Sequence, residues 1–311
     1  MNTLAAWSAL FLYLAFASAK WRALWQGLSE RIGDAAVGVL LIPMLLATGF
    51  RPTLLTLFAF ALYLAIPTLL LRFRPSRARP MDIFHILVAL SIWLPLEPSL
   101  FAMPIQRALG ASVGAWVEML ALPDVSASLL PGVHLPIEKL TGILLALHLF
   151  LVRHPLSHLG FDFRFRLRDL GYAAGGWALF GVVGIPLGLG MGFLRVNVVT
   201  PSWPELLGMI IGGYLLIALA EEILFRGVIQ NLLTQRWGDW RAGLVVAALI
   251  FGASHLNNAT PGFPEPNWAY MLMATIAGLA YGWVWWKTGR VTASAITHMS
   301  VNLAWAVLFA S

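Results

Sequence analysis

Three short groups of polar residues lie inside apolar stretches of this chain, where such side chains are costly. The first comprises Glu221, Glu222 and Arg226, all within the run YLLIALAEEILFRGVIQNLL. The others are His255 and the pair His298 and Asn302, which lie in two later apolar runs. A carboxylate at the centre of a bilayer costs at least about 2.5–3.5 kcal/mol. Acids in such a run are therefore either paired or functional.

Spacing separates the two adjacent glutamates. Glu222 and Arg226 are four residues apart, in the order that favours an ion pair on one helix face. Glu221 points about 100° away from Glu222 around an α-helix, so it cannot share Arg226 equally well. We therefore predict an ion pair between Glu222 and Arg226 and assign Glu221 to the chemistry. An alternative, in which both acids pair with bases from other helices, stays open.

The histidines have ordinary explanations when each is considered alone. Phe251 lies one turn before His255, which could be a packed, hydrogen-bonded residue of its helix. His298 and Asn302 share a helix face and could bond a neighbouring helix. Depth links the groups, however. Measured along the helices from the flanking basic loops, Glu221 and His255 lie roughly 22 and 21 Å deep, and His298 and Asn302 roughly 12 and 18 Å. One solvated cavity would account for all four.

Composition indicates which elements position these residues. The chain has 311 residues, of which 59% are hydrophobic and 11% charged. Soluble domains carry about 25% charged residues, so lipid must cover much of this surface. The chain lacks Cys, which excludes disulfides and thiolate chemistry. A net charge of +6 could suggest nucleic acid, but the basic residues lie mostly in short loops between apolar runs, as in membrane proteins.

We predict an all-α fold, a polytopic transmembrane helix bundle of about ten spans (8–10). Each span needs about 20 apolar residues. The predicted spans are 2–19, 35–50, 52–71, 82–97, 137–152, 171–194, 207–233, 242–256, 268–286 and 291–310.

If these spans alternate across the membrane, the basic residues fall on two unequal sides. Sixteen lie on one side and four on the other, namely Arg51, Arg107, Lys139 and Arg195. Because basic loops stay in the cytoplasm, both termini are predicted to be non-cytoplasmic. We expect a multi-pass protein of the bacterial inner membrane.

The three groups together resemble the motifs of the CPBP family, also called the CAAX protease and bacteriocin-processing or Abi family. The matching residues are Glu221-Glu222-x-x-x-Arg226, Phe251-x-x-x-His255 and His298-x-x-x-Asn302. The resemblance covers about residues 170–311, so these are predicted to form a catalytic core. Residues 1–169 are a predicted N-terminal transmembrane region to which we assign no role.

This resemblance implies an intramembrane endopeptidase that cuts a membrane-attached protein or peptide near its C-terminus. By the same resemblance, Glu221 and His255 would activate a water molecule, and His298 and Asn302 would form the oxyanion site. Glu222, Arg226 and Phe251 would provide structural support. The substrate could be a prenylated tail, a sorting tail or a bacteriocin-type peptide.

A metal cofactor is the main chemical alternative. Two His and one Glu form a ligand set used for catalytic zinc. The sequence has no His-Glu-x-x-His element, and an Asn suits an oxyanion site better than a zinc shell. We therefore expect no metal and no other cofactor, with zinc as the alternative.

Two other functions use the same residues. Intramembrane Glu and His residues with Gly-rich helices also mark transporters and ion-conducting proteins. However, the deep acids are confined to one helix, and no repeat relates the two halves of the chain. A catalytically inactive scaffold that binds a membrane partner is the third possibility, and the presence of all four polar residues weighs against it.

Overall fold

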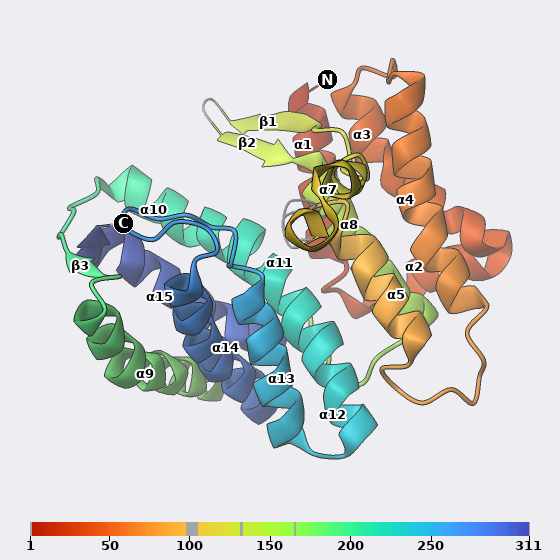
Figure 1. The fold of residues 1–311 in the computed structure, drawn as a ribbon. Helices are drawn as coiled ribbons and strands as arrows, with labels where there is room; N and C mark the ends of the chain where they lie inside the picture. Colours follow the sequence, from red (N-terminus) through yellow and green to blue (C-terminus); the bar gives the residue numbers. More distant parts are fainter. Residues whose placement is uncertain (1, 98–104, 131–132, 165, 311) are drawn as a thin grey trace. The chain divides into compact units, whose positions relative to one another are not determined.

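The computed structural model describes residues 2–97, 105–130, 133–164 and 166–310. The fold is mostly helical, as predicted, and Figure 1 shows helices along the described chain with a few short strands. The chain forms two compact units, Met1–Pro155 and Leu156–Ser311. Residues 156–164 and 166–169 therefore pack with the second unit. The assignment of a catalytic core and of a region without a role stays a prediction.

The first unit contains seven α-helices in its described residues, together with a two-stranded hairpin and two irregular helical turns. The α-helices are α1 (Asn2–Ala15), α2 (Ala19–Ile32), α3 (Ile42–Ala47), α4 (Leu54–Arg72), α5 (Ile83–Trp93), α7 (Ala111–Glu118) and α8 (Ile137–Leu147). The hairpin pairs β1 (Ser126–Leu130) antiparallel with β2 (Val133–Pro136). A 3₁₀-helix covers Gly33–Leu41, and a π-helical turn covers His148–Arg153.

Polar contacts fix the ends of these helices. Thr53 and Asp82 cap α4 and α5, each accepting a hydrogen bond from a backbone N–H of the first turn. Asp34 forms ion pairs with Arg72 and Arg153, at 3.1 and 2.7 Å.

The second unit carries all the residues with predicted chemistry. Its α-helices are α9 (Leu167–Gly190), α10 (Trp203–Gly212), α11 (Leu219–Glu222), α12 (Asn231–Trp237), α13 (Trp240–Ala253), α14 (Trp268–Thr288) and α15 (Val291–Leu308). Strands β3 (Arg195–Val196) and β4 (Phe309–Ala310) pair antiparallel. Helix α14 packs against α9, α13 and α15, as Figure 1 also shows.

Helix α11 belongs to one long helix with two distorted turns. Trp203–Trp237 runs continuously for 35 residues, and π-helical segments at Gly213–Ala218 and Ile223–Gln230 flank α11. π-Helical turns are rare and occur frequently at functional sites. Glu221 and Glu222, the two residues at the end of α11, therefore lie between two departures from α-helical geometry.

A criterion of helix length and hydropathy selects fewer membrane spans than the sequence predicts. Within the described residues, four helices are long and apolar enough to cross a membrane: Leu54–Arg72, Leu167–Gly190, Trp203–Trp237 and Val291–Leu308. They coincide with predicted spans 52–71, 171–194, 207–233 and 291–310. The structure does not confirm about ten spans. Asn2–Ala15, Ile83–Trp93 and Trp240–Ala253 are apolar but have 10–17 residues, fewer than a perpendicular crossing needs.

Candidate active site

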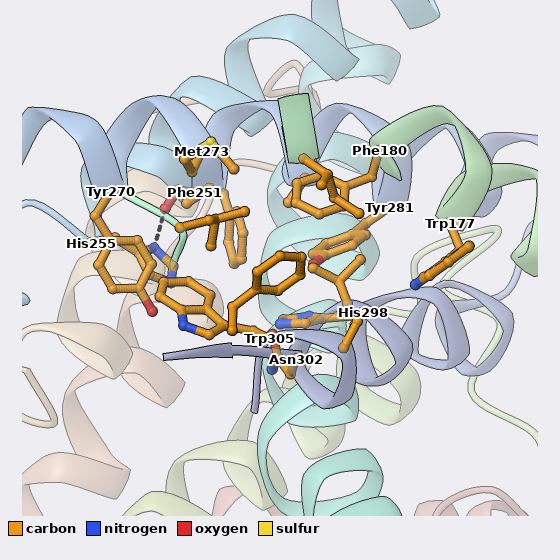
Figure 2. A pocket seen from close by; sticks show the side chains of 17 residues that line it. Trp177, Phe180, Phe251, His255, Tyr270, Met273, Tyr281, His298, Asn302 and Trp305 are labelled. Atoms are coloured by element: carbon orange, nitrogen blue, oxygen red, sulfur yellow. Dashed lines mark hydrogen bonds between the residues drawn. The ribbon is translucent and has the colours of Figure 1, made fainter. Parts of the chain in front are cut away.

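A cavity of about 50 Å³ lies within the second unit, between α9, α13, α14 and α15. Its walls are mainly apolar and aromatic, but His255, His298 and Asn302 also line it. Figure 2 shows these three side chains around the pocket with Tyr270. One water molecule needs roughly 10–15 Å³ of such space and polar partners, so the cavity has room for a few waters.

His255 lies just beyond the end of α13, and its ring has a defined hydrogen-bonding state. Its Nδ1 is 2.9 Å from the carbonyl oxygen of Phe251, the bond drawn in Figure 2. Because a carbonyl only accepts, Nδ1 carries the proton and donates. A neutral His255 therefore keeps a free lone pair on Nε2, as a general base requires.

His298 lies between the two glutamates. Its Nδ1 is 3.0 Å from Oε1 of Glu222, and its Nε2 is 3.9 Å from Oε2 of Glu221. Tyr281 stacks on the imidazole, with ring centroids 4.4 Å apart and planes at 15°. The His298 ring is thus held by Glu222 at Nδ1 and by the stacked Tyr281 ring on one face.

Glu222 is fully buried, with 0% of its side chain exposed. The predicted ion pair forms: Oε1 lies 3.0 Å from Nη1 of Arg226. Ser294 donates a hydrogen bond to the other carboxylate oxygen. Glu222 therefore connects its own helix to α15 through Ser294, and it also pairs with Arg226 one turn along the same helix.

Arg226 and Phe251 support this arrangement through packing. Arg226 is 1% exposed, donates from Nη2 to the Gly278 carbonyl at 3.1 Å, and stacks its guanidinium 4.4 Å from the Phe251 ring centroid. The Phe251 ring also contacts the rings of His255 and His298, with centroids 4.9 and 5.7 Å away. The Phe251 ring therefore packs against both histidine rings and against the buried guanidinium of Arg226.

Glu221 differs from Glu222 in exposure and partners. Its side chain is 34% exposed, and it is not among the residues that line the cavity. Among the described residues, His298 is the one basic side chain within 4 Å of its carboxylate. Glu221 therefore lies beside His298, which lines the cavity, and forms no other ion pair with the described residues.

Asn302 completes the group from α15. It lies one turn after His298 on the same face, and both line the cavity. The structure thus brings His255, His298 and Asn302 to one cavity and places Glu221 beside His298.

Comparison with protein families identifies this part of the chain. Residues 201–304 match the family model described as type II CAAX prenyl endopeptidase Rce1-like. This segment is therefore similar to the CPBP family of intramembrane proteases. The match contains all seven residues of the three motifs. A comparison with curated proteins and with solved structures found no match.

This similarity implies a protease, and together with the apolar helices it supports an integral membrane protein. It also implies a membrane-associated protein as the substrate.

Among the described residues, the donor atoms of this site do not come together as a zinc shell. In the part of the chain that the structure describes, no three His, Asp or Glu side chains come together to hold a metal ion. We therefore derive no step through a metal.

Three residues around the site were not predicted from the sequence. Ser294 bonds Glu222, Tyr281 stacks on His298, and the Tyr270 ring lies 4.9 Å from that of His255. Ser294 carried a usable signal, since it precedes His298 by four residues on one helix face. The tyrosines come from α14, which has no motif.

A second hollow adjoins the cavity. It has a volume of about 540 Å³, lies between α9, α10 and α15, and is almost wholly apolar. Trp177 and Ala304 line both spaces. The apolar surroundings of the site thus extend beyond the small cavity.

Proposed function

We propose that this protein is a metal-free intramembrane endopeptidase that hydrolyses a peptide bond near the C-terminus of a membrane-attached protein or peptide. One observation carries the proposal: His255, His298 and Asn302 line one cavity, and the Glu221 carboxylate lies beside His298. Such a group supplies both a base for water and donors for an oxyanion.

Glu221 and His255 are the proposed water-activating pair. The water oxygen bonds to the scissile carbonyl carbon while its proton passes to this pair. The tetrahedral intermediate then collapses, the C–N bond breaks, and the proton goes to the leaving amine. The free Nε2 of His255 and the Glu221 carboxylate, whose basic neighbour His298 lies 3.9 Å away, both suit proton transfer.

His298 and Asn302 are the proposed oxyanion donors. The amide of Asn302 can donate directly to the developing negative charge. His298 uses its Nδ1 proton for Glu222, so a proton on Nε2 requires the imidazolium form. Such a ring would carry its positive charge between two carboxylates and beside the oxyanion.

We place the protein in a bacterial inner membrane with both termini on the non-cytoplasmic side. Support comes from the uneven distribution of the basic residues, sixteen against four. The substrate is then a protein held in or at the same bilayer.

Removal of metal ions should leave the activity almost unchanged. Because the proposed base is a protein carboxylate rather than a metal-bound water, the cleavage rate should stay within about twofold after chelation. The assay uses the full chain in liposomes with a model membrane protein that ends in an apolar C-terminal segment. Complete loss of cleavage that added zinc restores would overturn the metal-free mechanism, whereas cleavage itself tests the endopeptidase activity.

A further inference from the structure

The ends of five helices of the second unit meet at one surface. Helices α9, α13 and α15 begin there, and α12 and α14 end there. Arg290, just before α15, forms ion pairs with Asp162 and Asp169 near the start of α9. The ring of Trp240, in the first turn of α13, stacks on that of Trp286 in the last turn of α14. We call the region formed by these helix ends the basic surface; it comprises residues 162–164, 166–169, 236–241 and 287–290.

The acids of the basic surface do not neutralise its positive charge. It contains seven basic and three acidic side chains. Asp162 and Asp169 both pair with Arg290. Asp239 accepts a hydrogen bond from the backbone N–H of Arg241 at 2.9 Å. Among the described residues, no carboxylate lies within 4 Å of the charged groups of the other six basic residues, all of which are exposed, namely Arg164, Arg166, Arg168, Arg236, Arg241 and Lys287.

Two stacked indoles restrain part of this unpaired charge. The ring centroids of Trp240 and Trp286 are 3.7 Å apart, with their planes at 9°. The guanidinium carbon of Arg241 lies 4.9 Å from the centroid of the Trp240 ring, and Nζ of Lys287 lies 4.2 Å from that of the Trp286 ring. A cation is attracted to the face of an indole, so both long side chains are restrained before any ligand binds. Such preorganisation lowers the entropic cost of binding an anion.

The length of α15 places the basic surface at the level of lipid headgroups. This helix is long and apolar enough to cross a membrane, and its 18 residues rise roughly 27 Å. The hydrocarbon core of a bilayer is about 30 Å thick, so Val291, the first residue of α15, lies near one of its boundaries. Trp286 and Lys287 precede Val291 by only five and four positions. Trp is enriched at this boundary, where its ring can contact both lipid tails and headgroups.

We propose that the basic surface binds the headgroup of an anionic phospholipid of the surrounding bilayer, with Arg241 and Lys287 on its phosphate. A guanidinium matches the oxygens of a phosphate with paired N–H donors, and an ammonium adds a compact charge. The other exposed arginines of this surface attract further headgroups through their charge. This inference does not depend on the proposed proteolysis.

Lipid binding to the purified full chain in detergent tests the proposal. The probes are phosphatidylglycerol, which is anionic, and phosphatidylcholine, which has no net charge. Native mass spectrometry gives the affinity for each lipid. The test variant carries Arg241→Gln and Lys287→Gln. The matched control carries Arg51→Gln and Arg107→Gln, which remove the same charge from exposed positions of the first unit.

We expect the wild-type protein to bind phosphatidylglycerol at least tenfold more tightly than phosphatidylcholine. The test variant should bind phosphatidylglycerol about 30-fold more weakly, because each basic residue near an anionic lipid contributes about fivefold. Its affinity for phosphatidylcholine and its unfolding midpoint without added lipid should stay unchanged, since both substituted side chains are exposed. The control variant should stay within twofold of the wild-type protein for both lipids.

Three results would overturn the proposal. The first is an equal affinity of the wild-type protein for the two lipids. The second is a test variant that binds phosphatidylglycerol within twofold of the wild-type protein. The third is a control variant that loses as much affinity as the test variant, because the effect would then follow net charge and not this surface. Cleavage of a substrate enters none of these measurements, so failure of the proposed function would leave their result unchanged.

Discussion

Glu221→Gln is expected to fold like the wild-type protein and to cleave its substrate about 10²–10⁴-fold more slowly, the usual contribution of a general base. The substitution removes the proton acceptor but keeps the size of the side chain. Its structural cost should be small, because the side chain is 34% exposed and its nearest basic group is 3.9 Å away. The cleavage rate and the thermal unfolding midpoint in detergent provide the two readouts.

Glu222→Gln is the matched control, one residue along the same helix. It should lower the stability by about 3–5 kcal/mol, because it leaves the buried Arg226 without its ion-pair partner. The two variants therefore separate a kinetic effect from a structural one. Full activity of Glu221→Gln, or a loss of stability as large as that of Glu222→Gln, would remove Glu221 from the chemistry.

Asn302→Ala is expected to lower kcat about 10²–10³-fold with little change in KM, as loss of one oxyanion donor does. The amide is proposed to bind charge that develops only in the transition state, so substrate binding should survive. Steady-state cleavage of the model substrate gives both constants.

Ser300→Ala is the control on the same helix. Ser300 bonds a carbonyl oxygen of its own helix and lies outside the wall of the small cavity, so its loss should be nearly neutral. A rise in KM at unchanged kcat for Asn302→Ala would show that Asn302 binds the substrate rather than the oxyanion.

Local spacing predicted the parts of the site that depend on one helix. The ion pair between Glu222 and Arg226 follows from residues four apart, and so does the shared face of His298 and Asn302. Of the four residues predicted to share a cavity, His255, His298 and Asn302 line one, whereas Glu221 does not. The depth of these residues was predicted from the rise per helical residue and the positions of the flanking basic loops.

Contacts between helices could not be predicted in the same way. The bond from His298 to Glu222 and the stacking of Tyr281 depend on how three helices pack, which no spacing encodes. The π-helical segments around α11 are likewise set by tertiary packing. About ten spans are not confirmed, because apolar runs such as 82–97 form helices shorter than a perpendicular crossing needs.

The central claim is that Glu221 and His255 act on the same water molecule, and a double-mutant cycle tests it most directly. Cleavage rates are measured for Glu221→Gln, for His255→Ala and for the variant that carries both. If the two side chains act as one unit, the double variant should cleave no more slowly than the slower single variant. Losses that multiply in the double variant would contradict the account, because the two residues would then act independently.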